Sequence, residues 1–266
     1  EVLDLAAIPL TDGYNIPLMG FTNGLVLDKY LFLVPSYAGV YHGRMPMIDT
    51  DTFTPDAVQV RDLREVDGDL KGFAGGFLAD IYAILVPYFN GLDFSGKGVR
   101  VDLTQTTDFA TTAVDVINLP DLGGDPELVG FKYGVASPDW VYFVPYQYSK
   151  MCRVRADSWP STSSGESASL AVVQFVDVGA KGFVGAMLQG EHVYMVPYWK
   201  ETPDGVDYSG RVVRVDVETF TDVSSFNMEE LDFRYGGFWD GVYHLAVSFT
   251  YDYVENDPPI PLFSTI

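Results

Sequence analysis

The sequence has little of the chemistry that crosslinks small domains or drives catalysis. It contains one cysteine, Cys152, which excludes an intramolecular disulfide framework. Its three histidines, His42, His192 and His244, form no HxH, HxxxH or HExxH spacing and give a zinc site no support. There is no GxSxG motif, and the glycine-rich pieces precede apolar stretches rather than helices, which disfavours a phosphate-binding loop. We therefore expect no metal site and no cofactor.

Basic residues are also scarce. The chain has 16 lysines and arginines against 37 acidic residues, a formal net charge of −21. A field of this sign repels nucleic acid and anionic membrane surfaces, so neither is an expected partner. No apolar run reaches the roughly 18 residues of a transmembrane helix, so no membrane span is expected. The acidity favours a basic partner, calcium or a salty compartment without choosing among them.

What the sequence does contain is a repeat. A tetrapeptide that ends in Pro-Tyr, or in a variant of it, occurs at residues 33–36, 85–88, 143–146 and 195–198, with a divergent copy at 245–248. Successive copies are separated by 52, 58, 52 and 50 residues. A sustained period near 50 in a sequence of β character indicates a repeat architecture.

Each copy has the pattern of four strands. A Gly-Phe pair, such as Gly72-Phe73, stands fourteen residues before the anchor valine in each of the first four copies, which predicts a first hairpin of fixed length. Asp28, Asp80 and Asp139 stand at its tip, where a tight turn is expected. The second strand is apolar throughout, which is typical of burial on both faces. Third strands are predicted at residues 44–49, 97–102, 150–155 and 211–216, and fourth strands at 57–63 and 113–119.

Four antiparallel strands per fifty residues is the pattern of a propeller blade. The sequence therefore predicts an all-β, five-bladed β-propeller that forms a single domain over residues 1–266. The blades are expected at about 20–63, 71–119, 130–178, 181–231 and 232–250. Residues 1–5 match a fourth strand and are expected to complete the last blade, which would remove an open sheet edge. Residues 251–266 form a proline-rich tail.

Many of the few basic residues occupy repeated positions. One set is Arg44, Lys97, Lys150 and Arg211, and a second set, three residues later, is Arg100, Arg153 and Arg214. Because side chains alternate along a strand, the two sets are expected on opposite faces. One interpretation pairs them with the repeated acids Asp49, Asp102 and Asp216, and another places an anion or carboxylate site at the ring centre.

Aromatic residues gather in the loop that follows the second strand. The candidate partner-binding residues are Tyr37, Tyr88, Phe89, Tyr146, Tyr148, Tyr198 and Trp199, together with Lys71 and Lys181 before the Gly-Phe pairs. Tyrosine and tryptophan bury large areas at low entropic cost, so these residues could stack on sugar rings or anchor a protein. The alternative is that they pack between neighbouring blades.

Catalytic carboxylates have weak support. Five-bladed propellers include glycoside hydrolases, which use paired acids. The predicted first strands at 73–78, 131–136 and 183–188 contain no acid, so candidates would come from the links: Asp12, Asp69, Asp125 and Glu230. The Asp67-Gly68-Asp69 sequence is interpreted as turn chemistry rather than as a fragment of a calcium site. Trp159, within a serine-rich loop, is expected to pack rather than to be exposed.

The repeat resembles a family of uncharacterised tandem-repeat proteins of marine algae, including haptophytes and dinoflagellates. Their unit is similar to KGFxGGFxDGxYxYxVPYxNGxxxGKVxRVDL followed by VxVLDL, and residues 71–77, 86–88, 96–97, 100–103 and 2–5 match it. The resemblance covers most of the chain, and the first and fifth copies depart from it most. It implies no activity, but it suggests an algal source and an organelle lumen or secreted setting.

The sequence thus favours a non-catalytic binding or assembly module, a propeller subunit that docks protein partners within a larger complex. The alternative is a carbohydrate-binding protein, either a lectin or a glycoside-hydrolase-like propeller, that uses the aromatic loops.

Overall fold

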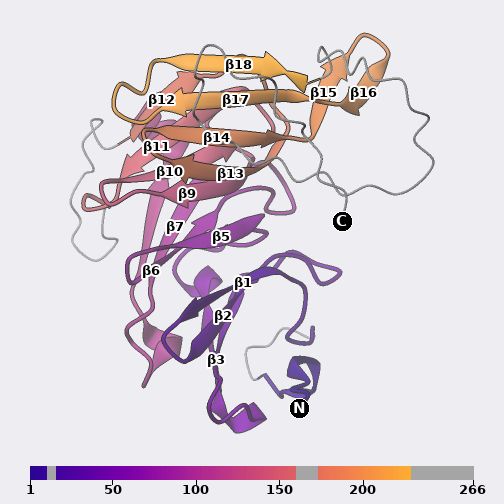
Figure 1. Ribbon diagram of the computed structural model, residues 1–266. Coiled ribbons are helices and arrows are strands. Elements are labelled where there is room, and N and C mark those ends of the chain that lie inside the picture. Colours follow the sequence, from indigo (N-terminus) through magenta and orange to yellow (C-terminus); the bar gives the residue numbers. More distant parts are fainter. Residues whose placement is uncertain (11–15, 160–172, 229–266) are drawn as a thin grey trace, which may run out of the picture. The chain divides into compact units, whose positions relative to one another are not determined.

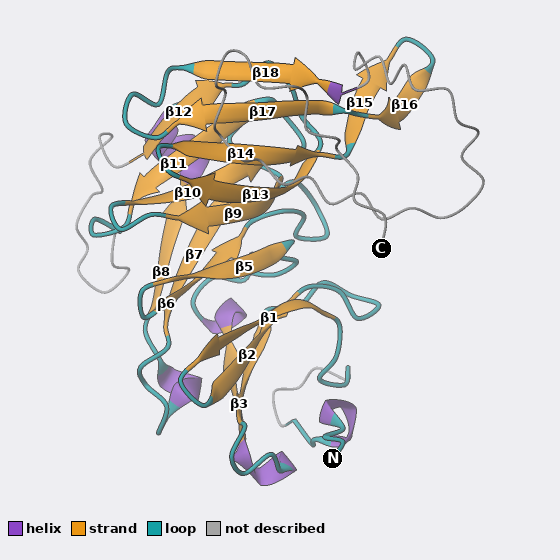
Figure 2. Ribbon diagram, viewed as in Figure 1, coloured by secondary structure: helices purple, strands orange, loops and turns teal. Residues whose placement is uncertain are grey.

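The computed structural model describes residues 1–10, 16–159 and 173–228, all within one compact unit, Glu1–Leu231. Strands dominate this part of the chain, and its helices are one-turn segments (Figure 2). The all-β prediction is confirmed. None of the helices in the described ranges is long and apolar enough to cross a membrane.

Four antiparallel sheets of four strands follow one another along the chain (Figure 1). Sheet 1 contains β1 (Phe21–Leu27), β2 (Tyr30–Pro35), β3 (Arg44–Asp49) and β4 (Val58–Asp62). Sheet 2 contains β5 (Gly75–Ala79), β6 (Tyr82–Val86), β7 (Lys97–Asp102) and β8 (Val114–Asn118). Sheet 3 contains β9 (Phe131–Ala136), β10 (Trp140–Pro145), β11 (Lys150–Arg155) and β12 (Val173–Asp177). Sheet 4 contains β13 (Phe183–Gln189), β14 (His192–Pro197), β17 (Arg211–Asp216) and β18 (Val223–Asn227).

The remaining elements are short. They are the 3-10 helices η1 (Leu5–Ala7), η2 (Pro55–Ala57), η3 (Leu63–Glu65) and η4 (Phe109–Thr111), the helix α1 (Leu119–Gly123), and a hairpin of β15 (Trp199–Thr202) and β16 (Gly205–Tyr208). The hairpin lies between the second and third strands of sheet 4, where the sequence predicted a polar loop. A turn signal was present, because Pro203 and Asp204 lie between the two strands and Gly205, which begins β16, has a φ of 128°.

Neighbouring sheets are joined through their first strands. Contacts link β1 to β5, β5 to β9 and β9 to β13. At the start of each first strand, the backbone also bonds to the preceding sheet: the Phe73 N–H donates to the carbonyl of Pro35 (3.3 Å), and that of Phe131 to Pro87 (3.0 Å). The side chain of Asn23 donates to the Gly76 carbonyl at 2.8 Å. The sheets therefore form a series in which each first strand is fixed by its neighbours.

The repeated Gly-Phe pair has a backbone cause. Gly20 and Gly72 have φ values of 81° and 71°, a region that side chains disfavour. A Cβ atom on Gly72 would lie 2.0 Å from the carbonyl oxygen of Phe89, and one on Gly20 would lie 2.2 Å from that of Tyr37. Glycine is thus required because the loop after the second strand crosses directly over it.

The core consists of apolar clusters between successive sheets. Phe32, Leu85 and Phe109 belong to the cluster of sheets 1 and 2. Cys152 and Trp159 belong to the next cluster, which confirms that Trp159 packs rather than projecting into solvent. The Cys152 thiol is fully buried, and this burial raises its pKa, so it is an inert core residue.

The predicted third strands coincide with β3, β7, β11 and β17, and Asp28 and Asp80 adopt positive φ at the hairpin tips. The closing strand expected at residues 1–5 is not among the described strands, and because the blade it would complete lies outside the described residues, it stays a prediction. Residues 1–4 have no strand structure, Leu5–Ala7 form a 3-10 helix, and the Val2 side chain is 96% exposed. The predicted last blade at 232–250 and the tail at 251–266 lie outside the described residues, so five blades stay a prediction.

Candidate functional site

The aromatic loops lie at equivalent ends of the four sheets, where each second strand has just ended. There the loop folds back on the repeated glycine of the first strand. The N–H groups of Ser36, Gln147 and Tyr198 donate to the carbonyls of the glycines at 20, 130 and 182, at 3.0, 3.1 and 3.1 Å. The same backbone contact therefore places each loop beside the start of its own first strand.

Seven rings from these loops form a continuous series, called here the aromatic row. Its members in order of contact are Tyr37, Tyr41, Phe89, Phe94, Tyr88, Tyr146 and Trp199. Successive ring centroids are 4.8 to 5.7 Å apart, and most pairs meet edge to face, the arrangement favoured by aromatic quadrupoles. The row crosses from sheet 1 to sheet 4, so it provides inter-sheet packing as well as a surface.

The predicted aromatic site residues differ in exposure. Tyr37 and Tyr198 are 54% and 48% exposed, and Tyr148 is also exposed. The other four, Tyr88, Phe89, Tyr146 and Trp199, are half-buried within the row. Tyr198 is in contact with Tyr208 of the hairpin (5.9 Å) rather than with the row. Tyr148 has no ring neighbour among the described residues.

Lysines accompany the row. The Lys181 Nζ lies 5.4 Å from the Trp199 ring and donates to Glu201 at 2.7 Å. The Lys71 side chain contacts no ring and no acid within the described ranges. Lys132 was not among the predicted site residues. Its Nζ lies over two rings of the row, 5.0 Å from Tyr88 and 4.5 Å from Tyr146, and burial lowers its pKa.

The first set of repeated bases bonds to the link that precedes its own sheet. Lys97 Nζ donates to Asp67 (2.7 Å) and Asp69 (2.9 Å). Burial alone would raise the pKa of Asp67, but the hydrogen bond and charge of Lys97 outweigh it and lower the pKa. In the next sheet Lys150 contacts Asp125 and Glu127 in the same way. The two carboxylates of the Asp67-Gly68-Asp69 turn therefore bind the Lys97 ammonium together.

The second set binds within its sheet and to the next one. Arg100 donates to Asp115 of β8 (2.7 Å) and to the carbonyl of Ala156 in sheet 3 (3.0 Å). Arg153 donates to Gln174 of β12 (2.8 Å) and to the carbonyl of Val217 in sheet 4. The two sets thus have different partners, as expected for opposite faces.

The interpretation that paired the repeated bases with acids such as Asp49, Asp102 and Asp216 needs other partners, because the hydrogen bonds of Lys97, Lys150 and Arg100 go to other acids. Asp49 bonds to Lys29 at 2.8 Å, and Asp102 accepts from the backbone N–H of Thr104. Asp216 accepts from the backbone N–H groups of residues 218 and 219. Short polar side chains at strand ends are used here for turn capping, which competes with long-range ion pairing.

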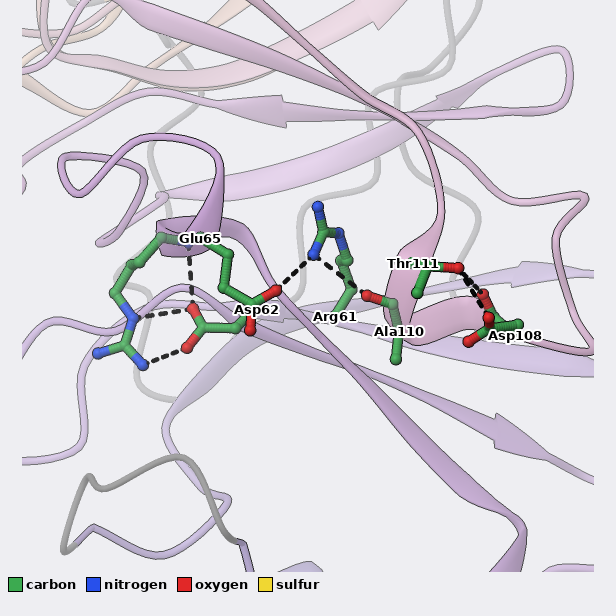
Figure 3. Close-up of polar contacts among 7 residues, drawn as sticks. Arg61, Asp62, Glu65, Asp108, Ala110 and Thr111 are labelled. Atoms are coloured by element: carbon green, nitrogen blue, oxygen red, sulfur yellow. Dashed lines mark hydrogen bonds and ion pairs between the residues drawn. The ribbon is translucent and has the colours of Figure 1, made fainter.

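Sheets 1 and 2 have a further polar contact at their fourth strands. Arg61 of β4 donates to Glu65 (2.7 Å) and to the carbonyl of Ala110 in η4 (3.1 Å), as Figure 3 shows. Gln59, two residues earlier, donates to the carbonyl of Thr106 and accepts from the N–H of Phe109. These hydrogen bonds join β4 to the segment around η4.

The candidate carboxylates do not form a catalytic pair in the described part of the chain. Asp69 is held by Lys97, and Asp125 by Lys150. The hydrogen bond from Lys150 lowers the pKa of Asp125, whereas a general acid needs a raised pKa. Asp12 and Glu230 lie outside the described residues. No group of three or more potential metal ligands occurs in the described ranges.

Comparisons with known proteins add little. No family model matches the chain, and no curated protein matches it. Among solved structures, Kluyveromyces lactis Hsv2 is similar with a TM-score of 0.43 and 10% identity, over 79% of this chain and 52% of that one. A chain from the S. cerevisiae complex of Dbp5 with Nup159, Gle1, IP6 and ADP gives 0.42 and 7%, over 84% and 51%. The chain thus spans about half the length of these structures, and likeness at this level carries no functional argument.

Proposed function

We propose that this chain is a non-catalytic binding module that docks a protein partner on the aromatic row and the exposed tyrosines beside it. In this proposal the four sheets are blades of a five-bladed propeller, and the protein acts as a subunit of a larger assembly. The observation that carries the proposal is the exposure of Tyr37, Tyr148 and Tyr198 on equivalent loops of three sheets. Tyrosine is enriched where proteins bind one another.

The energetics favour a preformed surface. The half-buried rings of the row pack edge to face, and the loops that carry them are bonded to the repeated glycines. Little conformational entropy would therefore be lost when a partner covers the exposed tyrosines. Because the net charge of the chain is −21, we expect the partner to be neutral or basic over most of its surface.

A random dodecapeptide display library provides the test. It is panned on the wild-type chain and on the triple variant Tyr37→Ser, Tyr148→Ser, Tyr198→Ser. These side chains are exposed, so the triple variant is expected to keep the wild-type melting temperature. We expect clones that bind the wild type and are lost on the variant. If every binding clone is retained on a folded triple variant, the aromatic row and its exposed tyrosines are not the docking surface.

A carbohydrate ligand is the second candidate. Tyr198 and Tyr208 are 48% and 73% exposed, and their ring centroids lie 5.9 Å apart in an edge-to-face arrangement, so both rings offer exposed aromatic surface on which a sugar could stack. Binding on a glycan array that is lost on Tyr208→Ser would favour this function. A glycoside hydrolase would in addition release the chromophore from a chromogenic glycoside, and both results together would replace the protein-docking proposal.

A further inference from the structure

Among the half-buried lysines that bond to no carboxylate within the described residues, Lys71 and Lys132, only Lys132 lies over aromatic rings. Lys29, Lys97, Lys150 and Lys181 each bond to at least one carboxylate. Lys132 contacts two tyrosine rings instead, and within the described residues no carboxylate lies within ion-pair distance of it. With 37 acidic residues in the chain, a half-buried lysine without a carboxylate is a departure that needs a physical reason.

The two rings lie beside the Lys132 ammonium but accept no hydrogen bond from it. Its Nζ lies 5.0 Å from the Tyr88 ring and 4.5 Å from the Tyr146 ring, whose centroids are 5.7 Å apart. Ring faces attract a cation, but they accept none of the three hydrogen bonds that an ammonium can donate. The Nζ atom has no hydrogen-bond partner among the described residues and is not completely buried.

Partial burial makes an added acceptor valuable at this position. Burial lowers the pKa of Lys132, which means that its charged form is incompletely solvated. A hydrogen bond between two charged groups is stronger than one between neutral groups, and more so away from water. A carboxylate that approached the ammonium between these rings would supply the charged hydrogen-bond acceptor that the described residues do not provide.

We infer that Lys132 receives a carboxylate from the docked partner, as the one charged contact in the middle of the aromatic row. This inference rests on the proposed function and specifies the chemistry of the partner. The partner segment presents one aspartate or glutamate side chain, flanked by apolar residues that cover the rings. Its remaining charge is neutral or positive, because the field of a chain at −21 repels a segment rich in acids.

The dodecapeptide library tests the inference with different variants. Clones are panned on the wild type, on Lys132→Met and on the control Lys29→Met. Lys29 is a matched control, because its Nζ also lies over a tyrosine ring, 5.2 Å from Tyr30, and its loss changes the charge equally. We expect the clones lost on Lys132→Met to carry aspartate or glutamate more often than the clones retained on it. The same clones should bind to Lys29→Met.

Synthetic peptides make the result quantitative. Replacing the acid of a selected peptide by its amide is expected to weaken binding roughly tenfold or more, as for a hydrogen bond between charged groups. The amide removes one negative charge from the peptide. Long-range attraction to this acidic chain would therefore, by itself, predict tighter binding of the amide peptide. Lys132→Arg should retain most of the affinity. Acetic anhydride labelling gives a second readout, in which the bound acidic peptide protects Lys132 and leaves Lys29 reactive.

Failure of this inference is distinguishable from failure of the proposed function. Clones that depend on the exposed tyrosines but bind Lys132→Met unchanged would overturn the role of Lys132 and leave the docking face in place. An amide peptide that binds as tightly as the acid would do the same. If no clone depends on the exposed tyrosines, both proposals fail together.

Discussion

Arg100 Nη1 donates a hydrogen bond to the carbonyl oxygen of Ala156 at 3.0 Å and thereby joins sheet 2 to sheet 3. Its guanidinium also binds Asp115 and lies over the rings of Tyr82 and Trp159. The equivalent Arg153 makes the same kind of bond to Val217 in sheet 4. Two equivalent arginines, one in sheet 2 and one in sheet 3, thus make the same inter-sheet contact, which leads to the first two predictions.

Arg100→Met is expected to destabilise the chain by about 2–4 kcal/mol, because Asp115 would be left as a largely buried charge without its partner. Urea unfolding followed by circular dichroism measures the change. Lys29→Met, at an exposed ion pair, is the control and should shift the midpoint little. A shift for Arg100→Met as small as for the control would show that the inter-sheet contact is unimportant.

Arg153→Met is expected to cost less than Arg100→Met, although the Arg153 side chain is the more buried of the two. It donates to the neutral Gln174 side chain and to the Val217 carbonyl, so its loss leaves no hydrogen-bonded carboxylate without a partner. Unsatisfied neutral acceptors cost about 1–3 kcal/mol, part of which the apolar methionine offsets by packing on Trp140. The same urea experiment ranks the two variants, and the reverse order would contradict the argument.

Gly20→Ala and Gly39→Ala form a matched pair, because both glycines have a φ of 81°. A Cβ on Gly39 meets nothing within 4 Å. Gly39→Ala should therefore cost only the strain of a side chain in the left-handed backbone conformation, about 1–2 kcal/mol. A Cβ on Gly20 would lie 2.2 Å from the Tyr37 carbonyl oxygen, and this clash should add about 1–3 kcal/mol. Equal losses in thermal unfolding would mean that the loop moves away without penalty.

The sequence predicted the repeated strands well because their signals are local. The third strands at 97–102 and 211–216 agree with β7 and β17 residue for residue, since an apolar alternation follows a polar loop in each copy. The turn at Asp80 was identified for the same reason. The partners of the repeated bases were not predicted, because Asp67 and Asp115 become neighbours of Lys97 and Arg100 only once the links and fourth strands are placed.

The candidate site was predicted in part. The aromatic composition of the loops could be read from the repeat, but the order of ring contacts depends on how adjacent loops meet, as for Tyr88 and Tyr146. Lys132 was missed because its neighbours are rings from two different sheets, which no spacing reveals. In the N-terminal segment, Val2 and Leu5 match a fourth-strand pattern, and this pattern gave no sign of the 3-10 turn that the Asp4 side chain caps.

Asp125→Asn should destabilise the chain at pH 6 and have no effect in strong acid. The hydrogen bond from Lys150 holds the pKa of Asp125 below its ordinary value of 3.8, so the ion pair contributes stability above that pH. The contribution is lost as the pH falls through the lowered pKa of the folded state. Urea midpoints of wild type and variant should therefore differ at pH 6 and converge in strong acid, once the pH lies below the lowered pKa of Asp125.

The exposed Asp56→Asn provides the control for that comparison, because Asp56 belongs to no ion pair among the described residues. It should track the wild type at both pH values. A gap for Asp125→Asn that persists unchanged into strong acid would show that the amide acts through packing rather than through the loss of charge.

Deletion of residues 1–6 is expected to leave the melting temperature nearly unchanged. The segment contributes no strand to any described sheet, Val2 is 96% exposed, and none of residues 1–8 has a buried side chain. Surface changes of this kind alter stability by about 0.5 kcal/mol or less. A paired closing strand would instead remove a row of backbone hydrogen bonds and two or three aliphatic contacts worth about 1.5–3 kcal/mol each. Differential scanning calorimetry separates the two cases, and a fall of many degrees would restore the closing strand that the sequence first suggested.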